Sequence, residues 1–377
     1  MNTRASLIAT AATLALFSAA NGQTVIDITG STAGRSTVDA QIKTLVSGET
    51  VGWYTTDGRT VTSSSSADGA IYKGGTLGGV SVTIRTFWAG SATGVDYVSN
   101  QVQLDNKFIA TTFTPTGAQF TPAAGDLAAA SAETVAEFGF SDVEQSATIY
   151  QTNPLAESTD IFVIPFRFLA TADTTGVTNI TSQQARAHFT STGETDKSLF
   201  TGVTGDNTQT VYAVGRDSDS GTRITALAET GAGAFATVGQ WGFTTTGSGA
   251  SVTLSAPEDL FDGGYASGGS VGTILGGTGF QAIGYVGISD ATAAISNGAV
   301  ALNFNGVPYT ADNVKNGSYT FWSTYQMLRQ QTLTGPTLSL FNSLKSSLIG
   351  AASGTSSIKL TDMQVVRAGD GATVYPN

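Results

Sequence analysis

The sequence contains no cysteine and a single histidine, His188, among 377 residues. The absence of cysteine excludes disulfide bonds, thiol chemistry and metal sites built on cysteine. It also excludes the lipid-modified cysteine that anchors lipoproteins, so we expect a free rather than a tethered protein. Because the side chains that transition metals favour are so scarce, we expect neither a metal site nor a cofactor.

Charged residues are also scarce, at 12% of the chain, and the acidic excess gives a net charge of −11. Soluble domains usually carry about twice this charged fraction. Proteins that bind nucleic acid or anionic membranes depend on a basic patch, so the balance argues against both partners. Any anion that the chain binds must be held by local groups, against the sign of the overall field.

Long apolar runs are missing except near the N-terminus. Arg4 precedes an apolar run over residues 5–20, and small residues surround a cleavage point between Ala20 and Gln23. The run is shorter than the ~20 residues of a typical membrane span. We therefore predict a signal peptide over residues 1–22 and a periplasmic or secreted location. The remaining chain of roughly 355 residues is long enough for two domains.

Segments typical of strands and of helices alternate along most of the chain. The predicted strands are residues 25–29, 80–87, 161–168, 210–214 and 282–288. The predicted helices are residues 181–188, 222–229 and 337–348, and another with Val38, Ile42 and Leu45 at helical spacing. The last residues, 358–375, are expected to be extended. This alternation predicts an α/β protein with mainly parallel sheets.

Two stretches interrupt the alternation. Residues 96–137 are rich in Thr, Ala and Gly, and the pattern over residues 108–113 predicts a hairpin. Residues 243–280 are rich in glycine. Neither stretch has a repeat period, and apolar residues continue through both. We interpret them as surface additions to the α/β core.

The segment from Arg216 to Thr222 follows a predicted strand and opens a predicted helix. A Ser-Gly-Thr turn at a helix start exposes backbone N–H groups, and the helix dipole adds partial positive charge there. Arg216, four residues before Ser220, can bring a planar guanidinium to the same anion. Alone, the segment fits equally well an ordinary helix cap with a solvated arginine.

Three further turns each follow a predicted strand, at residues 30–34, 89–94 and 138–142. Open α/β sheets bind their ligands at the carboxyl ends of the strands. Together with Arg216 and the turn at Ser220 to Thr222, these loops would bring small hydroxyl residues and free backbone amides to one place. The combination favours an oxyanion site.

Catalytic patterns are incomplete. Residues 268–272 match Gly-x-Ser-x-Gly, the turn that carries a serine nucleophile, but that arrangement needs a later histidine and His188 comes earlier. Chemistry on phosphoesters would need metal ligands or a paired nucleophile and base, which the sequence does not offer. We therefore expect no enzymatic activity.

The motifs, taken in order, resemble one family. They are Ile28 to Thr32, Gly90-Ser91, Ser141-Asp142, Arg-x-x-x-Ser-Gly-Thr at 216–222, Ala282 to Val286, Asn305 to Val307, and Asn316 to Tyr319 leading to Trp322. In this order they resemble the substrate-binding proteins of bacterial ABC-type phosphate uptake, in the type 2 periplasmic-binding-protein superfamily. The resemblance extends over essentially the whole chain after residue 22.

The resemblance implies a two-lobed α/β fold, each lobe a mainly parallel sheet flanked by helices, with two hinge crossings. It places the crossings near Ile164 and Tyr319, so that residues 23–163 with 320–377 form lobe I and residues 164–319 form lobe II. It further implies capture of inorganic phosphate between the lobes. The implied partners are phosphate and the membrane subunits of an ABC transporter, and we expect a monomer.

By the same resemblance, nine residues would hold the ligand: Ser31, Thr32, Ala33, Ser91, Asp142, Arg216, Ser220, Gly221 and Thr222. Asp142 would accept a hydrogen bond from a protonated phosphate oxygen. A carboxylate beside an anion is repulsive unless the ligand carries a proton to donate, and phosphate carries one near neutral pH whereas sulfate does not. Asp142 would therefore select against sulfate.

The sequence departs from the family pattern at three places. Ala33 and Gly34 follow Thr32 where an aromatic or branched residue is usual, and the segment between Ser91 and Asp142 is longer than usual. Asp217 and Asp219 make the anion segment, residues 216–222, unusually acidic. The two aspartates would either orient Arg216 or face solvent. Two alternatives stay open: the same fold with another oxyanion or an organic phosphate, and a secreted structural or adhesive protein without a small ligand.

Overall fold

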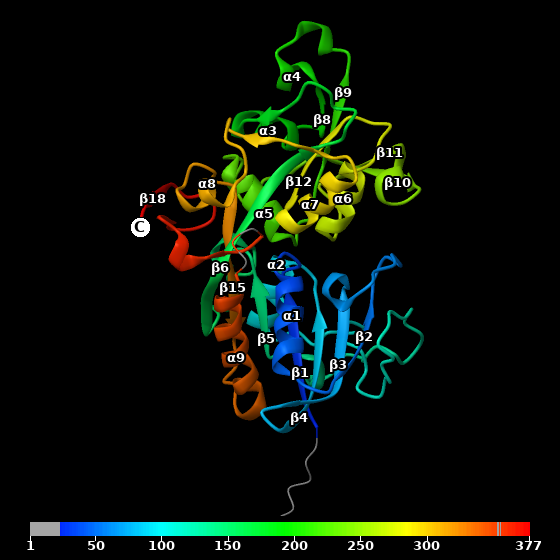
Figure 1. The fold of residues 1–377 in the computed structure, drawn as a ribbon, viewed down its shortest axis with the longest axis vertical. Coiled ribbons are helices and arrows are strands. Elements are labelled where there is room, and N and C mark those ends of the chain that lie inside the picture. The colour runs from blue at the N-terminus through cyan, green and yellow to red at the C-terminus, as the bar shows by residue number, and fades with distance from the viewer. Residues whose placement is uncertain (1–22, 353, 355) are drawn as a thin grey trace, which may run out of the picture.

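The computed structural model describes residues 23–352, 354 and 356–377, so the predicted signal peptide lies outside the described residues. Figure 1 shows two halves stacked along the long axis of the molecule, with two neighbouring strands at their junction. In the part of the chain that the structure describes, no helix is long and apolar enough to cross a membrane.

One twelve-stranded sheet passes through both halves. Across the sheet, its main path is β2 (Thr50–Tyr54), β3 (Gly69–Leu77), β4 (Val80–Phe87), β1 (Thr24–Gly30), β5 (Phe138–Ser141), β15 (Trp322–Arg329), β6 (Glu157–Ala170), β12 (Ala282–Gly287), β9 (Thr210–Val214) and β8 (Glu194–Asp196). Two short strands also pair with β6, namely β13 (Val300–Ala301) and β16 (Ile358–Lys359).

The long strand β6 joins the halves. Its residues up to Pro165 pair antiparallel with β15, and its residues from Phe166 onward pair antiparallel with β12. The first half therefore receives β15 from late in the chain, between β5 and β6. Strands from the beginning and from late in the chain thus lie side by side in one half of the molecule.

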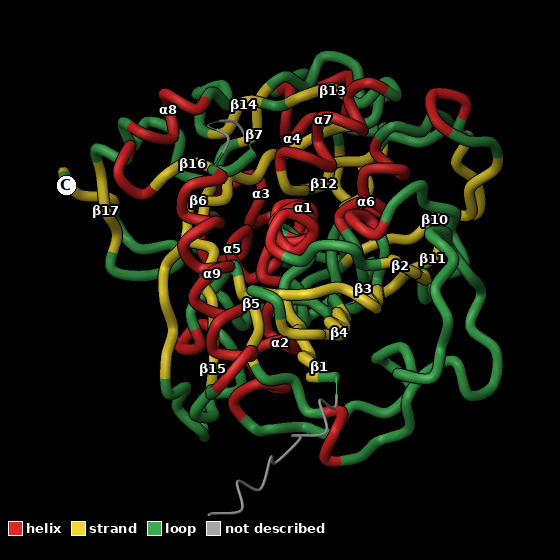
Figure 2. Tube along the Cα trace, turned by 60° about the horizontal axis from the view of Figure 1, so that its bottom comes forward, coloured by secondary structure: helices red, strands yellow, loops and turns green. Residues whose placement is uncertain are grey.

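Helices cover the sheet on both sides of the junction. Those of the first half are α1 (Arg35–Leu45), α2 (Ser91–Ser99) and α9 (Gly335–Ala351). The second half contains α3 (Ser182–Phe189), α4 (Ser198–Thr201), α5 (Gly221–Glu229), α6 (Gly268–Leu275), α7 (Ile288–Ser296) and α8 (Ala311–Lys315). In Figures 1 and 2, α1 lies next to α6, across the junction.

Three small two-stranded sheets complete the fold. They are β10 (Gln240–Thr246) with β11 (Thr253–Phe261), β7 (Asn179–Ile180) with β14 (Asn303–Phe304), and β17 (Val365–Arg367) with β18 (Val374–Pro376). The last pair forms a hairpin beside α5, because Arg367 forms a buried ion pair with Glu229 and stacks on the Trp322 ring.

Local sequence explains where several elements begin. Thr181 caps α3 through a reciprocal pair of hydrogen bonds with Gln184, as its position before the helix predicts. Ser220 caps α5, with its Oγ accepting a hydrogen bond from the N–H of Arg223. Strand β1 starts half-buried and ends fully buried, which is expected of a strand inside a sheet covered on both faces.

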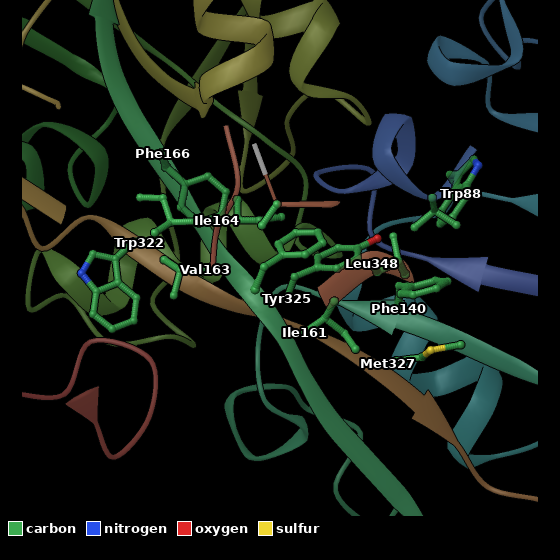
Figure 3. Close-up of a cluster of buried hydrophobic side chains, with 14 of the residues drawn as sticks. Trp88, Phe140, Ile161, Val163, Ile164, Phe166, Trp322, Tyr325, Met327 and Leu348 are labelled. Carbon is green, nitrogen blue, oxygen red and sulfur yellow. The ribbon is translucent and has the colours of Figure 1, made fainter. Parts of the chain in front are cut away.

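The core at the junction is aromatic. Tyr325 on β15 lies between the rings of Phe140 and Phe162, at centroid distances of 5.4 and 5.1 Å. Figure 3 shows Tyr325 among apolar side chains of β6 and β15. Its hydroxyl donates a hydrogen bond to the carbonyl of Ser31, at 3.3 Å. The stack of Phe140, Tyr325 and Phe162 therefore helps to hold the turn that follows β1, which is the first turn of the predicted site.

The fold class agrees with the prediction, but parallel pairing is more limited than expected. Within the large sheet it joins β1 to β4 and β5, and β9 to β12. The remaining pairs are antiparallel: β15 with β5 and β6, β12 with β6, β2 with β3, β3 with β4, and β8 with β9, as are the two short strands that pair with β6.

Four local predictions were wrong in part. Residues 138–142 are not a turn after a strand, because Phe138 to Ser141 form the buried strand β5 itself and only Asp142 follows it. Residues 108–113 form a loop without strands, in which Ile109 makes an isolated antiparallel bridge to Leu127 and the buried Phe108 ring packs against the Arg85 guanidinium. Residues 243–280 are not a surface addition, because they form most of the β10–β11 hairpin and all of α6, and bury residues such as Leu254 and Leu275. Residues 358–375 contain only short strands.

Candidate functional site

Several helices begin at the junction between the halves. A cavity of about 20 Å³ lies there, and it is lined by Thr32, Ala33, Ile164, Arg216, Thr222, Gly287 to Asp290, and Ser356. Thr32 and Ala33 directly precede α1, Thr222 is in the first turn of α5, and α7 begins at Ile288. The first N–H groups of a helix lack partners within it and carry partial positive charge, so this arrangement favours an anion.

Arg216 is the cationic residue that lines this cavity, and only 2% of it is exposed. Its Nε donates to the carbonyl oxygen of Tyr265 at 2.9 Å, and its Nη2 donates to that of Ala266 at 2.8 Å. Among the described residues, its Nη1 makes no hydrogen bond and no carboxylate forms an ion pair with it. The guanidinium is thus fixed by neutral oxygens and keeps its charge available to a ligand.

Asp142 is buried where β5 ends, with 1% of it exposed. Oγ of Ser91 donates to Asp142 Oδ1, and the backbone N–H of Asp142 lies 3.2 Å from the same Oγ. Burial raises the pKa of Asp142 to about 6, while the charge of Arg216 acts in the opposite direction. The site therefore holds a carboxylate that is mostly ionised at neutral pH.

The turn after β1 is fixed from two sides. The N–H of Ser31 donates to the carbonyl of Phe140 at 2.9 Å, and the Oγ of Ser31 accepts from the N–H of Ala33 at 3.1 Å. Thr32 and Ala33 stay half-buried and line the cavity. The turn thus aims its backbone at the junction.

The two halves touch directly at this site. A β-carbon on Gly221 would overlap Oδ1 of Asp142 and lie 2.6 Å from Oγ of Ser91. Gly90, with a φ of +109°, packs against the carbonyl of Asp219, which accepts a hydrogen bond from the N–H of Ala92 at 3.0 Å. The structure is therefore a closed arrangement in which both glycines are required for the close approach.

All nine residues that the sequence suggested lie at the junction. Ser31, Thr32, Ala33, Ser91 and Asp142 come from the first half, and Arg216, Ser220, Gly221 and Thr222 come from the second. Contacts join Ser91, Asp142 and Gly221, and a shared cavity joins Thr32, Ala33, Arg216 and Thr222. Ser220 contributes as the cap of α5.

Solved structures provide the comparison. No family model matches the sequence, and no curated protein matches it. The chain is similar to a protein of Clostridium perfringens assigned as a phosphate ABC transporter substrate-binding protein with bound phosphate. The identity is 17%, 89% of this chain and 100% of that chain are covered, and the TM-score is 0.53. An ABC-type phosphate transport receptor from Vibrio cholerae is similar at 14% identity, with 89% and 99% covered and a TM-score of 0.47.

The chain therefore has the two-lobed α/β fold of a periplasmic binding protein. In this fold the junction between the lobes is the place where a ligand can be enclosed by elements of both. The nine residues occupy that junction here.

Sequence reasoning missed four groups at the lobe junction. Asp290, in the first turn of α7, lines the same cavity as Arg216, and Arg35 lines the adjoining one. The carbonyls of Tyr265 and Ala266 hold Arg216. Backbone acceptors carry no side-chain signature, so no sequence pattern could have identified them. Arg35 lies two residues after Ala33, and its position at a helix start was the available signal.

Asp217 and Asp219, the acidic residues of segment 216–222, form no ion pair with Arg216 among the described residues. Asp217 donates its N–H to the carbonyl of Tyr265 at 3.2 Å, and Asp219 contributes its carbonyl to the interlobe contact with Ala92. Both residues are half-buried. Their backbones therefore shape the segment.

The junction offers little for a metal ion. Among the residues that the structure describes, no three carboxylate, histidine or cysteine side chains are grouped so that they could hold one.

Proposed function

We propose that this chain is a solute-binding protein that captures inorganic phosphate between its lobes for ABC-type uptake. The observation that carries the proposal is the buried guanidinium of Arg216, fixed by two carbonyl oxygens and free of any carboxylate ion pair within the described chain. A buried charge without a counterion is costly, and a bound anion would supply that counterion.

The remaining groups would act as directional donors. The starts of α1, α2, α5 and α7 bring backbone N–H groups to the junction, and Thr32 and Thr222 add hydroxyls. The hydroxyl hydrogen of Ser91 is donated to Asp142, so Ser91 would contribute its backbone N–H. Hydrogen bonds to an anion are roughly twice as strong as those between neutral groups. Such a set would hold phosphate without covalent chemistry, and accordingly we propose no enzymatic activity.

Asp142 would distinguish phosphate from sulfate. Its Oδ1 already accepts from Ser91, so its other oxygen would accept from the O–H of a monohydrogen phosphate. Sulfate has no proton to donate near neutral pH and would meet an unpaired buried carboxylate. That mismatch is the physical basis of a strong rejection.

The lobes would open and close about two strands. We propose crossings near Ile164 in β6 and Tyr319 just before β15, with lobe I formed by residues 23–163 and 320–377 and lobe II by residues 164–319. The change of partner of β6 at Phe166 supports the first crossing. Removal of a signal peptide over residues 1–22 would place the protein in the periplasm or outside the cell. There the closed monomer would be recognised by the membrane subunits.

Titration calorimetry on phosphate-stripped protein tests the proposal. Phosphate should bind saturably and sulfate should not, and Arg216→Ala should abolish phosphate binding. The exposed Arg186 supplies the matched control, because Arg186→Ala removes the same side chain far from the junction. Absence of saturable phosphate binding by the unaltered protein would overturn the proposal and favour a secreted structural role.

A further inference from the structure

A second carboxylate lines the anion cavity. Asp290 lies in the first turn of α7 and shares the cavity with Thr32, Arg216 and Thr222. It is half-buried, and its carboxylate forms no hydrogen bond or ion pair with any described residue. The cavity therefore combines one uncommitted cation with a carboxylate that has no partner.

The position of Asp290 is enforced by α6. A β-carbon on Gly268, the first residue of α6, would overlap Oδ2 of Asp290 and lie 3.8 Å from Nη1 of Arg216. The carboxylate and the uncommitted Nη1 thus face the same small space. Glycine at this position allows the Asp290 carboxylate to reach the cavity.

Three cationic side chains face Asp290. Arg216 belongs to the same lobe, and Arg35 and Arg59 come from the other one. Asp68 binds both Arg35 and Arg59, at 3.5 and 2.5 Å, and so offsets their charge. Asp57 forms a further ion pair with Arg59. Arg216 is therefore the cation in this group that lacks a carboxylate of its own.

Charge arithmetic limits which ligand fits such a cavity. Arg216 carries one positive charge, and Asp142 and Asp290 together carry two negative charges when ionised. A dianion with a single acidic hydrogen would donate it to Asp142. The Asp290 carboxylate would then face the dianion with no proton between the two negative groups. A ligand with two acidic hydrogens satisfies both carboxylates.

We propose that Asp290 is a second specificity-determining carboxylate. The closed complex of phosphate with the protein then holds one proton in addition to the one that monohydrogen phosphate carries. This inference rests on the proposed phosphate function. The proton is shared between a phosphate oxygen and a carboxylate oxygen of Asp290, so the complex is equally dihydrogen phosphate with an ionised Asp290 or monohydrogen phosphate with a protonated one. Burial also raises the pKa of Asp290, against the charges of Arg35 and Arg216.

Proton uptake on binding tests this inference. Above the second pKa of phosphate, binding by the unaltered protein should take up about one proton per phosphate, and its affinity should fall about tenfold per pH unit. Calorimetry at about pH 8 in buffers of different ionisation enthalpy counts the protons. Asp290→Asn should still bind phosphate, with the uptake and the pH slope lost. A purely structural role for Asp290 would change the affinity but not the proton count.

The control is Asp312→Asn, which changes an exposed carboxylate in the first turn of α8. It should keep the uptake of the unaltered protein. Phosphate binding with no proton uptake and no pH slope above the second pKa would overturn the inference and leave the proposed function intact. Failure to bind phosphate at every pH would instead overturn the proposed function.

Discussion

Gly221 lies directly against Asp142 across the lobe junction, so closely that a β-carbon on the glycine would overlap the carboxylate. The two residues come from different lobes, and the contact exists only when the lobes are closed. Gly221 is also the first residue of α5, where alanine is well tolerated by the helix itself. The contact therefore tests closure separately from folding.

Gly221→Ala should prevent full closure and weaken phosphate binding by about 100-fold or more, because the added methyl group occupies space that Asp142 and Ser91 need. Calorimetry with phosphate measures the loss, and thermal unfolding without phosphate should be nearly unchanged. Gly350→Ala is the matched control, since a β-carbon on Gly350 in α9 meets nothing within 4 Å. Equal affinity of Gly221→Ala and the unaltered protein would show that closure does not depend on this contact.

His188 should not titrate in the folded protein across the physiological range. Its ring is fully buried, with Nδ1 2.8 Å from Oγ1 of Thr195 and the rings of Phe189 and Phe200 at its edges. Burial lowers the pKa of His188 to about 3. Because the unfolded chain binds the proton more readily, stability from this group is lost as the pH falls below about 6.5.

Nuclear magnetic resonance gives a direct measurement, because the sequence contains one histidine and so one Cε1 proton signal. In tag-free protein that signal should stay constant between about pH 5 and pH 8, and in urea it should shift with a midpoint of about 6.5. A midpoint near 6.5 in the folded protein would contradict the buried neutral ring.

Glu137 should make the protein less stable as the pH rises. Its Oε2 accepts the N–H of Asp27 at 2.5 Å, and burial together with the charge of Asp27 raises the pKa of Glu137 to about 8. The folded state thus keeps a proton that the unfolded state has lost above about pH 4.5, so stability falls between these values. Asp370, with a pKa raised to about 7 by burial, acts in the same direction.

Between about pH 6.5 and pH 8, His188 no longer contributes, and the loss from Glu137 should be about 2 kcal/mol. Urea unfolding at several pH values measures this slope. Glu137→Gln keeps a neutral oxygen acceptor and should flatten it, whereas the exposed Glu194→Gln should leave it unchanged. An unchanged slope in Glu137→Gln would show that Glu137 is already ionised in the folded protein over this range.

The ion pair between Asp27 and Arg85 should be essential to lobe I. Nε and Nη2 of Arg85 donate to the two oxygens of Asp27, and the residues are 3% and 1% exposed. Arg85→Met would leave a buried carboxylate unpaired and should cost about 3–5 kcal/mol. The loss, measured by urea unfolding, should be smaller at acidic pH because Asp27 can then take up a proton.

Arg186→Met, at an exposed position, is the control for the loss of one positive charge. A double variant, Asp27→Leu with Arg85→Met, removes both partners of the buried ion pair. The double variant should be more stable than Arg85→Met alone, because no unpaired charge remains. If both variants were equally unstable, packing rather than charge would explain the loss.

Sequence patterns located the elements that local chemistry determines. The predicted bounds of β4 and β9 agree with the structure, and Thr181 caps α3 as expected. The loop at Phe108 was predicted as a hairpin because its alternation is real, but its apolar side chains fill the space beside Arg85 instead of forming a ladder. Tertiary packing decided that segment.

The sequence predicted the parts of the candidate site that consist of side chains. It did not predict the parts that consist of backbone groups. Arg216 and its following Ser-Gly-Thr turn stand out in the sequence, whereas the carbonyls that hold Arg216 belong to Tyr265 and Ala266, about 50 residues later. Asp290 has no motif around it, and only the fold brings it to the cavity. Its meeting with Arg216 depends on long-range packing, which one sequence does not reveal.

The position of β15 between β5 and β6 has a consequence for folding kinetics. The register joins Phe140 to Met327, so β5 cannot gain its second neighbour until nearly the whole chain is available. Pairings over such separations form slowly, because the intervening chain must first lose its conformational freedom. Until β15 arrives, β5 presents an open edge to other chains. A chain that stops before Trp322 should therefore aggregate rather than fold as an independent lobe.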